Sequence, residues 1–111
     1  MESSLDLTFT PDARERFISF LSSITDYPPT LCLMKAVNLD EPEGWWTYGA
    51  YGPSNIETVG PMLEERGHSL LYRAEGLLIA IPQYQFISEL VGKTIGLGED
   101  RLIVLHRELR A

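Results

Sequence analysis

The sequence predicts a mainly β domain, sandwich-like or a distorted barrel, with two short α-helices. Segments in which apolar and polar residues alternate outnumber segments with helical spacing. The chain has 111 residues, of which 44% are hydrophobic and 23% charged, as is typical of a globular domain. It contains no repeat and no linker, so we expect a single domain over residues 1–111.

The first two predicted elements are a strand and a helix that meet at Thr10. Leu5, Leu7 and Phe9 alternate with polar residues, which indicates a short half-buried strand. Thr10 suits a helix N-cap, and Pro11 suits the first helical position. A helix over 11–24 is therefore expected, with one apolar face made by residues three and four apart: Ala13, Phe17, Phe20, Leu21 and Ile24.

Two further strands are expected over 30–37 and 45–51, joined by a loop over 38–44. In the first strand Leu31, Leu33 and Lys35 share one side, and Cys32 lies on the other. The second strand is rich in aromatic residues. A turn at 52–55 follows. Residues 56–67 are ambiguous, with one helical turn over 61–66 that ends at Gly67.

The second half of the chain predicts two hairpins around a helix. The segments 69–72 and 77–81 form the first hairpin, with Gly76 in its turn. A helix over 83–91 ends where Gly92 suits the position after a C-cap. The second hairpin joins 94–97 to 101–106 through a short polar turn.

Two stretches resemble the HesB-type domain of the A-type iron–sulfur cluster carriers. The first is residues 7–17, Leu-Thr-Phe-Thr-Pro-Asp-Ala-Arg-Glu-Arg-Phe, which is similar to that family's opening strand, cap and helix. The second is Gly-Leu-Leu-Ile-Ala-Ile-Pro at 76–82, continued by Leu-Val-Gly-Lys-Thr-Ile at 90–95. The resemblance covers nearly the whole chain. It implies a HesB-like distorted barrel or sandwich.

The cysteines depart from the family pattern. Members that carry a cluster have one cysteine in the loop after the second strand and two more in a Cys-Gly-Cys tail. Here the corresponding loop, residues 38–44, has no cysteine, and the tail motif does not occur. The only cysteine, Cys32, matches no family ligand, and a dimer would offer two thiolates where a cluster needs about four. The resemblance therefore implies the fold and argues against a bound cluster, and we expect no cofactor.

Charge and cysteine content limit the partners and the compartment. The net charge is −7 with nine basic residues, which disfavours binding to nucleic acid or to anionic membranes. The first residues are acidic and polar, unlike a signal peptide, and no apolar run approaches the ~20 residues that cross a bilayer. A lone thiol without an export signal suggests the cytoplasm.

The aromatic strand over 45–51 has two interpretations. Both of its faces pack in the core, or one face is exposed, in which case we expect Trp46 and Tyr48 to be presented. An acidic loop precedes this strand and carries Asp40, Glu41 and Glu43. Aromatic residues beside carboxylates favour a basic or amphipathic protein partner. A homodimer that buries part of the strand is a further expectation.

Three other residues are weaker candidates. Cys32 is expected to be a buried structural residue rather than a reactive thiol. His68 and His106 have no ligand at a metal-binding spacing, so surface or capping roles are expected. No local catalytic signature occurs, and a non-catalytic domain that acts through protein contacts is the first expectation. The alternative is a small enzyme or ligand-binding domain whose pocket uses Tyr48, Tyr84 or His106.

Overall fold

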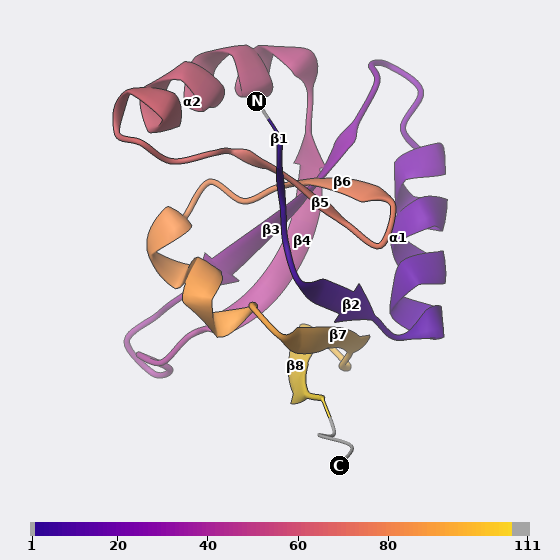
Figure 1. Ribbon diagram of the computed structural model, residues 1–111. Helices are drawn as coiled ribbons and strands as arrows, with labels where there is room; N and C mark the ends of the chain where they lie inside the picture. Colours follow the sequence, from indigo (N-terminus) through magenta and orange to yellow (C-terminus); the bar gives the residue numbers. More distant parts are fainter. Residues whose placement is uncertain (1, 108–111) are drawn as a thin grey trace.

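The computed structural model describes residues 2–107 as a curved mixed sheet with helices on both of its faces (Figure 1). This part of the chain forms eight strands in the order β1-β5-β6-β3-β4-β8-β7-β2. The strands are β1 (Glu2–Ser4), β2 (Leu7–Phe9), β3 (Thr30–Ala36), β4 (Trp45–Tyr51), β5 (Leu71–Ala74), β6 (Leu77–Ala80), β7 (Lys93–Leu97) and β8 (Leu102–His106). The helices are α1 (Pro11–Ser22), α2 (Pro53–Glu65) and the 3-10 helix η1 (Tyr84–Glu89).

One segment of the chain borders both ends of this sheet. β1 pairs in parallel with β5, and β2 pairs in parallel with β7, with only Leu5 and Asp6 between β1 and β2. The Leu5 N–H also donates to the Arg73 carbonyl at 3.0 Å, which extends the contact with β5. In Figure 1 this segment runs down the front of the molecule from β5 to β7. The two edges of the sheet are therefore joined through residues 2–9.

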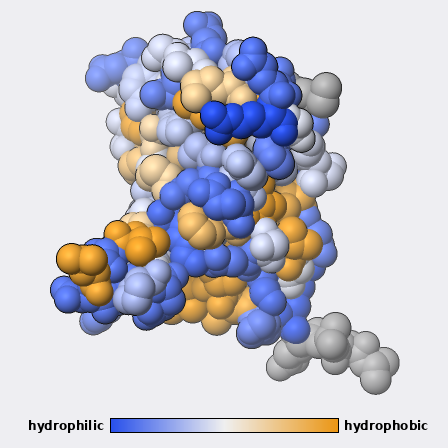
Figure 2. Space-filling model, turned by 90° about the vertical axis from the view of Figure 1, so that its left-hand side faces the viewer, coloured by the Kyte–Doolittle hydropathy of each residue, from blue (hydrophilic) through white to orange (hydrophobic). Residues whose placement is uncertain are grey.

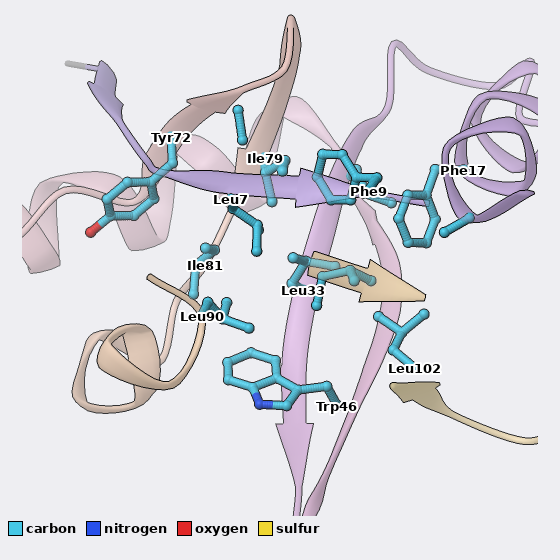
Figure 3. Packing of buried hydrophobic residues seen from close by; sticks show 14 residues of the cluster. Leu7, Phe9, Phe17, Leu33, Trp46, Tyr72, Ile79, Ile81, Leu90 and Leu102 are labelled. Carbon is cyan, nitrogen blue, oxygen red and sulfur yellow. The ribbon is translucent and has the colours of Figure 1, made fainter. Parts of the chain in front are cut away.

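β3 lies at the centre of the sheet and is buried on both faces. It pairs with β4 over all seven of its residues and with β6 in parallel. Leu31, Cys32 and Leu33 are all fully buried, although successive side chains point to opposite faces. Leu31 and Leu33 belong to the larger core cluster, on the side of α1, and Cys32 to a smaller cluster on the side of α2. Figure 3 shows the larger cluster, in which Leu33, Trp46 and Leu90 lie close together.

The structure confirms the predicted first helix, which ends two residues earlier than expected. Thr10 is the N-cap, and its side chain accepts a hydrogen bond from the Ala13 N–H at 3.3 Å. Ala13 and Phe17 are fully buried, as their spacing predicted. The Phe17 ring meets the Phe9 ring edge-on, with centroids 5.7 Å apart, so α1 packs against the strand that precedes it.

The second helix is longer than the sequence predicted. Residues 52–55 were expected to form a turn, but α2 begins at Pro53 and runs through the ambiguous segment. The Gly52 N–H donates to Asn55 Oδ1 at 2.8 Å, and Pro53 occupies the first helical turn, where it needs no N–H partner. The helix packs on the smaller core cluster through apolar residues at spacings of three and four: Ile56, Val59 and Leu63.

The two hairpins occur where they were expected, with strand ends shifted by one or two residues. The β5–β6 turn holds Glu75 and Gly76 at positive φ, 46° and 78°, which matches the twist of a tight hairpin. The predicted helix over 83–91 is the shorter 3-10 helix η1. The high strand content fits the predicted mainly β class, whereas the described part of the chain has three helices rather than two. Among them, none combines the length and apolar character that a bilayer crossing requires.

Phe17→Ala should lower the free energy of unfolding by about 3–5 kcal/mol, because it leaves a large cavity between α1 and β2. The matched control is Ile18→Ala on the next position of the same helix, where the side chain is 46% exposed. Urea unfolding followed by circular dichroism compares the two variants. Equal losses would show that the buried face of α1 has been assigned wrongly.

Candidate functional site

Of the two interpretations of the aromatic strand, the one in which Trp46 and Tyr48 form an exposed surface is wrong. Trp46 is only 4% exposed and belongs to the larger core cluster. Tyr48 packs edge-on against Phe17 and Phe20 of α1, with ring centroids 5.0 and 5.1 Å apart. Because side chains alternate along β4, the face that holds Trp46 and Tyr48 is the one that α1 and the core cover. Trp45 lies on the opposite face.

A polar group at the end of the core was missed by sequence reasoning. Glu89 of η1 accepts hydrogen bonds from Lys35 Nζ at 2.6 and 2.7 Å and from Trp46 Nε1 at 3.3 Å. Lys35 Nζ also lies 4.9 Å from the centroid of the Phe86 ring. The sequence did contain one sign of this group: Lys35 lies on the same face of its strand as the core residues Leu31 and Leu33. A cation in such a place needs a partner.

The Gln83 side chain completes the attachment of η1 to β3. Its Oε1 accepts from the Lys35 N–H at 2.7 Å, and its Nε2 donates to the Lys35 carbonyl at 2.9 Å. β6 pairs with β3 at Leu31 and Cys32 and ends at Ala80. The amide of Gln83 therefore takes the place that a further residue of a neighbouring strand would occupy. These polar groups satisfy one another, which indicates a structural role for the group.

The predicted acidic loop forms the hairpin tip, defined here as residues 37–44 between β3 and β4. Asn38 Oδ1 accepts from the Glu41 N–H at 2.7 Å, and the Gly44 N–H donates to the Glu41 carbonyl at 3.0 Å. Gly44 has a φ of 74°, and a Cβ there would lie 2.6 Å from the Ala36 carbonyl oxygen. These contacts give the hairpin tip one defined backbone course.

Arg101, from the turn before β8, holds the hairpin tip from outside. Its guanidinium donates to both carboxylate oxygens of Glu41, at 2.7 and 3.0 Å, and its Nε donates to Asp100 at 3.1 Å. The hydrogen bond from Arg101 keeps the pKa of Glu41 below its usual range. The guanidinium also lies over the Trp45 ring, 4.9 Å from the centroid. Glu41 is therefore neutralised by a partner, and Trp45 is half-buried under an arginine.

The rest of the hairpin tip is open to solvent. Leu39 is 100% exposed and Val37 is 54% exposed. The acidic residues Asp40 and Glu43 are exposed beside them. In Figure 1 the loop projects at the lower left, and in Figure 2 an apolar end surrounded by hydrophilic surface lies on the projecting lobe at the lower left. The hairpin tip thus combines two exposed apolar side chains with two exposed carboxylates.

The residues of the alternative ligand-binding interpretation lie in separate places. Tyr48 borders an open hollow of about 200 Å³ between β4 and the β7–β8 turn, which Arg16 and Arg101 also line. Ligand pockets usually measure about 300–1,000 Å³ and are more enclosed. Tyr84 instead stacks on His68, and His106 lies at the end of β8. The structure does not bring these three candidates together.

The three weaker candidates, Cys32, His68 and His106, each contact neighbouring side chains that suit a structural role. Cys32 is fully buried among residues that include Leu63 of α2, and burial raises the pKa of its thiol to about 12. The ring of His68 stacks on Tyr84 with centroids 3.8 Å apart, and His106 Nδ1 lies 3.0 Å from Lys93 Nζ. Over residues 2–107, no three side chains of His, Cys, Asp or Glu are placed together to hold a metal ion.

Comparison of the chain with models of protein families, with curated proteins and with solved structures gave no match.

Trp46→Ala should lower the free energy of unfolding by about 3–5 kcal/mol, because it opens a cavity and removes a hydrogen bond to Glu89. Trp45→Ala is the matched control on the other face of the same strand, and a smaller loss is expected there. Chemical denaturation of both variants gives the comparison. A negligible loss of unfolding free energy for Trp46→Ala would show that Trp46 is a surface residue and not part of the core.

Proposed function

We propose that the chain is a HesB-like domain that has lost the ligands of an iron–sulfur cluster and acts without catalysis, through contacts with another protein. The order of elements supports the resemblance. A strand, the Thr10 cap and α1 follow one another as the first stretch implies. In the second stretch β6 is followed by Pro82, η1, the Leu90–Gly92 turn and β7. A sheet whose edges meet along residues 2–9 fits the distorted barrel of that family.

The donor atoms of this chain do not fit a cluster. Its one thiol, on Cys32, is fully buried on the α2 side of the sheet. Burial also favours the protonated thiol over the thiolate that binds iron. By the resemblance, the hairpin tip corresponds to the loop that holds a cysteine in the family. It presents Leu39, Asp40 and Glu43 there instead.

The full exposure of Leu39 on a well-defined loop carries the proposal of a protein contact. Single exposed leucines are common on protein surfaces, and most have no binding role. Here the loop around Leu39 is held by Asn38, Gly44 and Arg101. A loop that is already ordered loses little conformational entropy when it binds. The exposed Leu39 and Val37 then supply the apolar area of the contact.

The negative charge around Leu39 indicates what kind of partner surface would bind there. Asp40 and Glu43 lie beside it, whereas Glu41 is neutralised by Arg101. The whole chain carries a net charge of −7. A surface with an apolar hollow and a basic rim would therefore bind the hairpin tip best. Because the resemblance aligns the hairpin tip with the family's cysteine-bearing loop, we propose a partner from the machinery of iron–sulfur cluster assembly.

A photo-crosslinking amino acid at position 40 should capture one discrete partner in cells, because the adjacent Leu39 enters the contact. Adding Leu39→Ser should abolish the adduct while the thermal melting curve of the protein stays the same. A crosslinker at Met62 of α2 is the control, since Met62 is 53% exposed on another surface. The adduct is identified by mass spectrometry. An adduct that persists with Leu39→Ser, or that forms equally from position 62, would refute the proposed contact.

A further inference from the structure

We draw no further inference here: the strongest candidate, the open groove between α2 and β5 that is lined by Ile56, Gly60 and Leu70, carries nothing because nothing in the structure shows what covers it.

Discussion

The pairing of residues 2–9 with both edges of the sheet is the constraint on which the rest of the structure depends. Glu2 pairs with Leu71 and Phe9 pairs with Ile95, so one short segment joins parts of the chain that are far apart in sequence. This segment also brings Leu7 and Phe9 into the core and places Thr10 at the start of α1. The position of α1 against the core therefore follows from the closure of the sheet.

The hairpin tip depends on the same closure through a series of contacts. β2 holds β7, β7 holds β8, and the turn between β7 and β8 carries Arg101. Arg101 in turn binds Glu41 and covers Trp45. The fixed backbone of the exposed loop thus depends on the pairing of β2 with β7, two strands that are distant from the loop in sequence. The backbone of the loop that carries the exposed Leu39 is therefore held by contacts with residues outside the loop.

The sequence predicted an element correctly where the residues of that element alone show its type and its bounds. Thr10 and Pro11 marked the start of α1, and the strand that begins at Trp45 has the predicted bounds. The orientation of β4 could not be predicted, because both of its faces carry aromatic residues and alternation does not tell which face is covered. In α2, Gly60 and Pro61 obscured the spacing of the apolar residues. The contact between Lys35 and Glu89 joins positions 54 apart, which no local pattern shows.

The central claim of the proposed function is that this domain does not bind an iron–sulfur cluster. Anaerobic incubation with iron and sulfide, followed by absorption spectroscopy and iron analysis, tests this claim most directly. The account predicts no sulfide-to-iron charge-transfer bands and the same trace of iron in wild type and Cys32→Ser, because the buried thiol stays protonated. A cluster bound in stoichiometric amount, whether or not it survives Cys32→Ser, would contradict the account.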